Sequence, residues 1–223
     1  LKKIGFDNII ISGDTRFDRV YEVYKNFKDN TIVEKFCSES FVIVCGSTWP
    51  EDEKILSSFI NNSSDSFKFI IAPHEITESH VKNIIQSIKQ PVVLYSEANK
   101  KIENLSSYKV LIIDNIGMLS SLYKYGKVAY IGGGFGVGIH NILEAAVYGI
   151  PVIFGPNFKK FKEALDLLNL KGAFSINNYE SFENIINLFY YNIEYLNKSG
   201  SIARQYVINN CGATEKIVNY IFK

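Results

Sequence analysis

Residues 130–144 read YIGGGFGVGIHNILE, and five of these fifteen residues are glycines. They follow an apolar run, KVAY (127–130), and precede HNILEAAVYG (140–149), which predicts a helix that opens near His140. Glycine loses much conformational freedom on folding and adds no side-chain packing. A glycine cluster between a strand and a helix therefore indicates that some group approaches the backbone closely.

Apolar runs alternate with helical patterns along the chain. The runs are rich in Ile, Val, Phe and Tyr with few polar interruptions, as in parallel strands buried on both faces. They occupy residues 8–12, 41–46, 67–72, 92–96, 109–114, 127–132 and 151–155. Residues 16–27 and the segment from Tyr179 have apolar side chains at helical spacing. This alternation predicts an α/β fold with a Rossmann-like, doubly wound parallel sheet, followed by a helical segment at about 178–223.

Composition and charge limit the possible functions. The chain has 223 residues, of which 47% are hydrophobic, and its 24 basic and 23 acidic residues nearly balance. A nucleic-acid surface would need a basic excess. The three scattered cysteines show neither a metal-binding spacing nor a disulfide framework, which favours a reducing compartment. No apolar run reaches the roughly 18 residues of a membrane span. Because the first residue is Leu, we expect the chain to begin at a domain boundary of a longer protein.

The loops that follow the strands are the candidate ligand-binding segments, because open α/β sheets bind ligands beyond the carboxyl ends of their strands. Four of them stand out: GSTWPED (46–52), PHEIT (73–77), DNIGML (114–119) and GGGFGVGIHN (132–141). The glycines of the last loop would let a phosphate reach the unpaired N–H groups of the helix that follows. The alternative is a tight turn with close helix–strand packing.

Two common nucleotide motifs are absent from this loop. The glycines do not follow the G-x-G-x-x-G dinucleotide fingerprint, and the next strand does not end in an acidic residue. No Gly-Lys-Ser/Thr occurs either. Glu144, in the first turns of the expected helix, can accept both hydroxyls of a ribose, or it is simply an acid favoured at a helix start. His140 and Asn141 can cap the helix or donate to a phosphate or sugar.

Residues 130–164 resemble the nucleotide-binding half of the 3-deoxy-D-manno-octulosonic acid (Kdo) transferases. The family pattern is a glycine-rich strand end, then G-H-N-x-L-E, then G-x-P-V-x-F-G-P, and Ile139 replaces the second glycine of this pattern. The segments SGDTRFDRV (12–20), CGSTWPEDE (45–53) and DNIGMLSSLYKYGKVAYIGG (114–133) also resemble family landmarks, in the same order. The resemblance therefore covers nearly the whole chain.

This resemblance implies a two-domain glycosyltransferase of the GT-B type. Residues 1–20 would be the interdomain junction, and residues 21–223 the C-terminal domain that binds CMP-Kdo. The N-terminal half of such an enzyme carries the acceptor site for lipid A, the catalytic base and a membrane anchor at the cytoplasmic face of the inner membrane. The fragment would then be a soluble donor-binding half without catalysis of its own. Its partners would be CMP-Kdo and, through the other half, a lipid A precursor, with no metal or further cofactor and no nucleic acid.

The resemblance also implies the residues that contact the CMP group. They lie in three loops: Pro73 and His74; Ile116, Gly117 and Met118; and Asn141, Ile142, Leu143 and Glu144. The family usually has Pro-Arg-His-Pro in the first loop, whereas this chain has APHEI, so His74 would act alone. Many relatives have Glu in place of Met118. The catalytic residues would lie outside this chain.

Further contacts to the phosphate or sugar are expected from residues around these loops. The candidates are Ser47, Gly134, Gly136, Gly138, His140 and Lys159. Ser47 lies in a segment that also reads as a helix cap, and Lys159 can pair with the carboxylate of the donor sugar or belong to a solvated helix face.

Three other functions remain open at this point. The nearest is a UDP-sugar-dependent GT-B transferase or epimerase, which shares a glycine loop and a ribose-binding Glu. A non-catalytic nucleotide-binding module is the second. The third, a nicotinamide oxidoreductase, is disfavoured by the broken glycine pattern.

Overall fold

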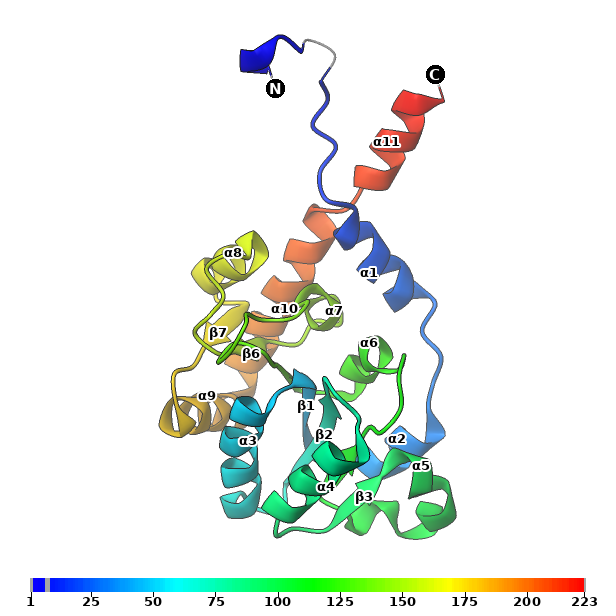
Figure 1. Cartoon of the computed structure of the whole chain (residues 1–223), viewed down its shortest axis with the longest axis vertical. Coiled ribbons are helices and arrows are strands. Elements are labelled where there is room, and N and C mark those ends of the chain that lie inside the picture. Colours follow the sequence, from blue (N-terminus) through cyan, green and yellow to red (C-terminus); the bar gives the residue numbers. More distant parts are fainter. Residues whose placement is uncertain (1, 7–8, 223) are drawn as a thin grey trace.

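The computed structural model describes residues 2–6 and 9–222. Its centre is a seven-stranded sheet with the order β3-β4-β2-β1-β5-β6-β7, and every strand pairing in the described residues is parallel (Figure 1). The strands are β1 Phe41–Thr48, β2 Phe67–Pro73, β3 Val92–Leu94, β4 Val110–Ile112, β5 Val128–Ile131, β6 Val152–Phe154 and β7 Ala173–Ser175. The predicted Rossmann-like α/β class is confirmed.

Helices cover both faces of this sheet. The α-helices are α1 Thr15–Lys25, α2 Thr31–Cys37, α3 Pro50–Asn62, α4 Glu78–Ser87, α5 Tyr95–Ala98, α6 Leu119–Leu122, α7 Leu143–Ala146, α8 Lys162–Leu170, α9 Tyr179–Tyr191, α10 Ile193–Asn209 and α11 Ala213–Ile221. Short 3-10 segments are η1 Lys2–Ile4, η2 Asn99–Ser107 and η3 Tyr123–Tyr125.

The core lies in two layers, one on each face of the sheet. Alternate residues of β1 point to opposite layers: Val42 and Val44 pack into one, and Ile43 and Cys45 into the other. This period of two is the geometry of an extended strand. Helices α1, α2 and α10 contribute to the first layer, and α3, α4 and α9 to the second. Burial on both faces explains why the strands read as nearly continuous apolar runs.

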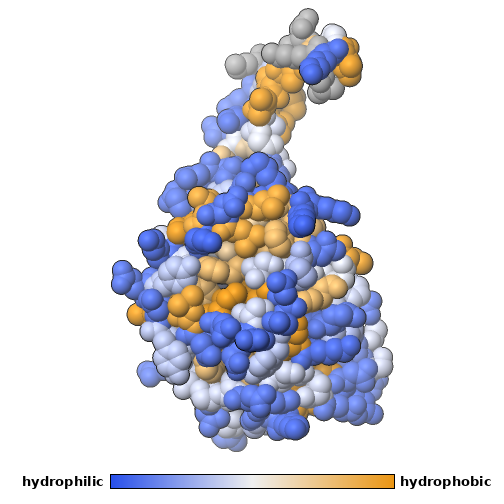
Figure 2. All heavy atoms as spheres, turned by 90° about the vertical axis from the view of Figure 1, so that its left-hand side faces the viewer, coloured by the Kyte–Doolittle hydropathy of each residue, from blue (hydrophilic) through white to orange (hydrophobic). Residues whose placement is uncertain are grey.

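The first apolar run, residues 8–12, is wrongly predicted as a strand. Asn8 lies outside the described residues, and residues 9–12 belong to no strand. Ile11 is 93% exposed, because this segment leads away from the sheet and beside α11 (Figure 1). Apolar side chains gather on this projecting end of the molecule (Figure 2). Strand β7 carries a weaker signal and was not predicted.

The helix after the glycine loop is shorter and later than predicted. It begins at Leu143, not near His140, and α7 ends at Ala146. The side chain of Asn141 accepts a hydrogen bond from the backbone N–H of Leu143 (3.1 Å), so His140 and Asn141 belong to the loop. The prediction of a helical segment at about 178–223 is confirmed by α9, α10 and α11. The division into residues 1–20 and 21–223 stays a prediction, and α1 runs across its boundary.

The strand order brings three of the singled-out loops to one edge of the sheet. Strands β2, β1 and β5 are neighbours, so the segments that follow them meet at their carboxyl ends. Strand β4, next to β2, adds the loop at 114–118. Within the described part of the chain, no helix is both long and apolar enough to cross a membrane.

Candidate functional site

A buried carboxylate ties the glycine loop to the start of α3. Asp52 is fully buried and accepts three hydrogen bonds, from the Tyr130 hydroxyl (2.6 Å) and the backbone N–H groups of Gly133 and Trp49 (2.9 Å each). Burial nevertheless raises the pKa of Asp52, because the loss of solvent outweighs these three donors. The loops after β1 and β5 are therefore held together by one side chain.

Close packing of the chain explains the first glycines of the loop. A Cβ atom on Gly132 would lie 2.2 Å from the carbonyl oxygen of Ser47, and one on Gly134 would lie 2.6 Å from the nitrogen of Gly155. Gly133 has φ +87°, which favours glycine. The tight-turn alternative thus accounts for residues 132–134. At exposed Gly136, in contrast, a Cβ would meet nothing nearer than 3.9 Å.

Three aromatic rings from three strand ends form a cluster beside this loop. The Trp49 and His74 rings stack with centroids 4.5 Å apart, and the His74 and His140 rings lie 4.6 Å apart. The indole N–H of Trp49 donates to Nε2 of His140 at 3.1 Å. Burial first, and His74 second, lower the pKa of His140, while the Asp52 carboxylate opposes this shift. The lowered pKa of His140 favours its neutral form.

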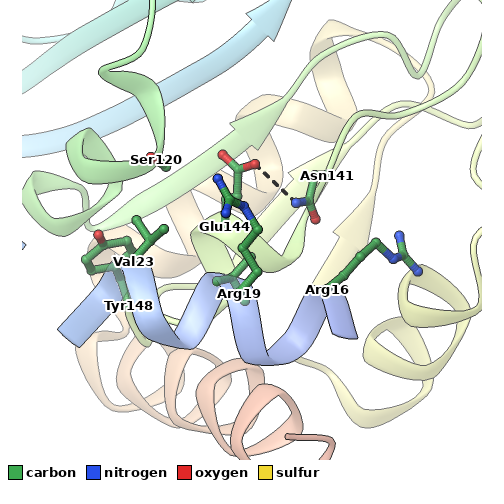
Figure 3. A pocket seen from close by; sticks show the side chains of 8 residues that line it. Arg16, Arg19, Val23, Ser120, Asn141, Glu144 and Tyr148 are labelled. Atoms are coloured by element: carbon green, nitrogen blue, oxygen red, sulfur yellow. Dashed lines mark hydrogen bonds between the residues drawn. The ribbon is translucent and has the colours of Figure 1, made fainter. Parts of the chain in front are cut away.

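Glu144 and Asn141 line a cavity of about 170 Å³ between α1, α6 and α7 (Figure 3). Asn141 Nδ2 donates to Glu144 Oε1 at 3.1 Å, which orients the carboxylate. Burial raises the pKa of Glu144, although Asn141 and Arg19 both lower it. The lining residues are Arg16, Arg19, Val20, Val23, Ser120, Asn141, Glu144 and Tyr148.

The cavity holds polar groups that a hydroxyl-bearing ligand can use. The Tyr148 hydroxyl is buried and has no hydrogen-bond partner among the described residues. Arg16, at the start of α1, pairs with Asp14 and with the buried carboxylate of Glu163, both at 2.7 Å. The carboxylate of Glu144, the amide of Asn141 and two arginines around one small cavity suit a polar, hydroxyl-bearing ligand rather than an apolar one.

The structure brings together some of the predicted residues and separates others. His74 and His140 meet in the ring cluster, and Asn141 and Glu144 share the cavity. The side chains of Ile142 and Leu143 are buried in the core, so only their backbone is available to a ligand. Pro73 is buried at the end of β2.

The remaining candidates lie on the rim of the strand ends. Ile116 is 87% exposed, Gly117 is exposed with φ +92°, and Met118 is half-buried. Ser47 has φ +53°, an uncommon backbone conformation for a residue with a side chain. Lys159 is exposed. Gly134 and Gly138 are buried, whereas Gly136 is open to solvent.

Sequence reasoning did not single out Trp49, Asp52, Arg19, Ser120 or Tyr148 as site residues. Arg16 and Arg19 are three residues apart on α1, so a helical pattern places them on one face. The contacts of Trp49 with the two histidines depend on the strand order and carry no local signal. Among the described residues, no group of three His, Cys, Asp or Glu side chains is arranged to hold a metal ion.

Comparisons with known proteins give several Kdo transferases as relatives by sequence, together with a bifunctional glycosyltransferase/methyltransferase of Fusobacterium nucleatum that is 30% identical over 76% of this chain and 27% of that protein. No protein-family model matches the chain. The 3-deoxy-D-manno-octulosonic acid transferase of Rickettsia typhi is 32% identical over 149 residues, which are 65% of this chain and 32% of that protein. The chain spans about a third of the length of the curated relatives that it matches.

The fold has solved counterparts at lower sequence identity. The C-terminal CMP-Kdo binding domain of WaaA from Acinetobacter baumannii has a TM-score of 0.65 at 18% identity, over 86% of this chain and 97% of that domain. MnaA of S. aureus, solved with UDP, has a TM-score of 0.66 at 16% identity, over 99% of this chain and 56% of that one. The sequence-based resemblance to the Kdo transferases is confirmed: this chain is a homologue of one part of these proteins and has the fold of a GT-B glycosyltransferase domain.

Proposed function

We propose that this chain is the donor-binding half of a glycosyltransferase that transfers Kdo from CMP-Kdo to a lipid A precursor in lipopolysaccharide assembly. The cavity at Glu144 carries this proposal. Its carboxylate, oriented by Asn141, lies at the carboxyl edge of the sheet, where open α/β sheets bind ligands. The similarity to Kdo transferases supports CMP-Kdo as the donor.

In this proposal Glu144 holds the ribose of the nucleotide. An ionised carboxylate has two oxygens and can accept from both hydroxyls of a diol. The backbone of Ile142 and Leu143, the loop with Pro73, and the rim residues Ile116, Gly117 and Met118 would complete the nucleotide contacts.

The phosphate would bind beside the ring cluster. Since α7 is a single turn, it is too short to supply the helix dipole that the sequence suggested. The donors are instead the imidazoles of His74 and His140, which lie beside the open part of the glycine loop at Gly136. The backbone N–H groups of Gly136 and Gly138 already donate to the carbonyl of Gly133, at 3.0 Å each. Ser47 and Lys159 are further candidates, with Lys159 for the carboxylate of the sugar.

The proposed reaction is a transfer of Kdo with CMP as the leaving group. A hydroxyl of the lipid A precursor attacks the anomeric carbon of Kdo, the bond to the phosphate oxygen breaks, and CMP leaves. Negative charge develops on the phosphate, where donors fixed in advance stabilise it most. The base that takes the hydroxyl proton would come from the rest of a longer protein at the cytoplasmic face of the inner membrane. The scheme needs no metal and no cofactor besides the donor.

Titration with CMP and UMP tests the proposal. We expect CMP to bind more tightly than UMP, and Glu144→Gln to weaken CMP binding about tenfold or more, because a charged acceptor is lost. The matched control is Glu180→Gln, which changes an exposed acid in the first turn of another helix, α9. A preference for UMP would favour a UDP-sugar enzyme, and equal affinities of the Glu144 variant and the wild type would refute the ribose role.

A further inference from the structure

We propose that Trp49 is a positioning residue that selects the tautomer of His140. The indole nitrogen of Trp49 is a donor only. Its contact with Nε2 of His140, at 3.1 Å, therefore requires Nε2 to carry no proton. A neutral His140 must then hold its single proton on Nδ1, because the hydrogen bond of one ring nitrogen sets the state of the other.

One buried carboxylate holds Trp49 and the glycine loop to which the backbone of His140 is bonded. Asp52 accepts from the backbone N–H of Trp49 and from that of Gly133, both at 2.9 Å. The backbone N–H of His140 in turn donates to the carbonyl of Gly132 at 3.2 Å. The His74 ring packs against both side chains. The backbones of Trp49 and His140 are thus fixed by the fold, and the packed His74 ring limits the motion of both side chains.

The selected tautomer leaves a donor free. Nδ1 of His140 makes no hydrogen bond with the described residues, and it is not among the fully buried polar atoms without a partner. It is therefore open to solvent or to a ligand. Resting on the proposed function, we infer that Nδ1–H donates to a phosphate oxygen of the bound nucleotide. The Nε2–H tautomer, which histidine prefers in water, would turn Nδ1 into an acceptor and repel that oxygen.

The groups around His140 favour its neutral form, which is the form that has two tautomers. The groups that face His140 are His74 from the end of β2, Asp52 from α3 and Trp49 itself. Burial and His74 disfavour the imidazolium, and the Trp49 N–H opposes a proton on Nε2, whereas Asp52 favours the charged form. In the neutral form of His140, the position of its single proton decides whether Nδ1 can donate.

The tautomer can be observed directly by NMR in the free protein. Ring ¹⁵N shifts of ¹⁵N-labelled protein distinguish the two tautomers, and the variants His74→Gln and His80→Gln identify the His140 signals among the three histidines. Trp49 is the only tryptophan, so its indole N–H gives a single resonance. We expect His140 to be protonated on Nδ1 at pH 8, and to shift to the Nε2–H form in Trp49→Phe, which keeps an aromatic ring but lacks the donor.

Two results from this measurement would overturn the inference. One is a wild-type His140 with its proton on Nε2, which needs no variant to detect. The other is an unchanged tautomer in a folded Trp49→Phe protein.

The pH dependence of CMP binding separates positioning from a structural role of Trp49. We expect Trp49→Phe to bind CMP about tenfold more weakly at pH 8. The difference should vanish below the pKa of His140, since the imidazolium carries Nδ1–H in both proteins. A deficit that is the same at all pH values would refute positioning. If the wild type shows the Nδ1–H tautomer but binds no CMP, the proposed function fails while the tautomer selection by Trp49 stands.

Discussion

Asp52→Ala should destabilise the protein more than any other change of an acidic residue at the site. The substitution leaves three donors without an acceptor: the Tyr130 hydroxyl and the backbone N–H groups of Gly133 and Trp49. Each buried, unsatisfied donor costs about 1–3 kcal/mol. The relief of a buried charge offsets part of this, so we expect a loss of about 3–6 kcal/mol in the free energy of unfolding.

Urea unfolding, followed by the fluorescence of Trp49 and by circular dichroism, measures this loss. Asp52→Asn keeps one oxygen for the backbone donors and should cost only about 1–2 kcal/mol. Glu51→Ala, next to it on the exposed side of α3, is the matched control and should stay within about 0.5 kcal/mol of the wild type. A cost below about 1 kcal/mol for Asp52→Ala would show that the carboxylate does not hold the two loops together.

Two further predictions concern the glycine loop and Glu144. Gly132→Ala should destabilise the fold by about 3 kcal/mol, because its Cβ would lie 2.2 Å from a backbone oxygen. Gly136→Ala should leave thermal unfolding unchanged and weaken CMP binding. Equal melting temperatures of the two variants would contradict this prediction. Burial raises the pKa of Glu144 above its ordinary 4.5, so the folded protein binds this proton more tightly than the unfolded chain does. The resulting contribution to the free energy of unfolding is fully present below pH 4.5 and is lost as the pH rises through the raised pKa. CMP binding, which needs the carboxylate, should strengthen over the same interval, and a calorimetric pH series that shows the same rise in Glu144→Gln would contradict the assignment.

The sequence predicted the sheet well where a strand is buried on both faces. The runs that became β1, β2 and β5 are apolar because helices cover both sides of them. The run at 8–12 has the same composition but no neighbouring strand, and hydrophobicity alone does not distinguish the two cases. Similarly, HNILEAAVYG has helical periodicity, yet Gly149 has φ +78° and Pro151 follows, so only one turn forms.

The site was predictable to the extent that it depends on strand ends. Loops after parallel strands gather at one edge, which is why the loops that contain His74 and His140 were both candidate ligand-binding segments. No local sequence pattern predicts the strand order β2-β1-β5. This order places Trp49 in contact with both His74 and His140. Tyr148 and Arg19 line one cavity although they are far apart in the chain, because α1 packs beside α7. Such contacts arise from tertiary packing and leave no local pattern.

The glycine loop shows why composition alone left two interpretations open. A glycine required by the approach of the chain and a glycine required by a ligand are the same letter in the sequence. In the structure the two requirements occupy different parts of the loop: Gly132 and Gly134 each touch backbone atoms, while Gly136 is exposed with room for a side chain. Since packing does not explain Gly136, the proposed phosphate contact is our interpretation of the bare backbone there. We therefore expect CMP to shift the NMR signals of residues 136–141 and to leave those of 132–134 nearly unchanged, and the opposite pattern would move the phosphate away from the ring cluster.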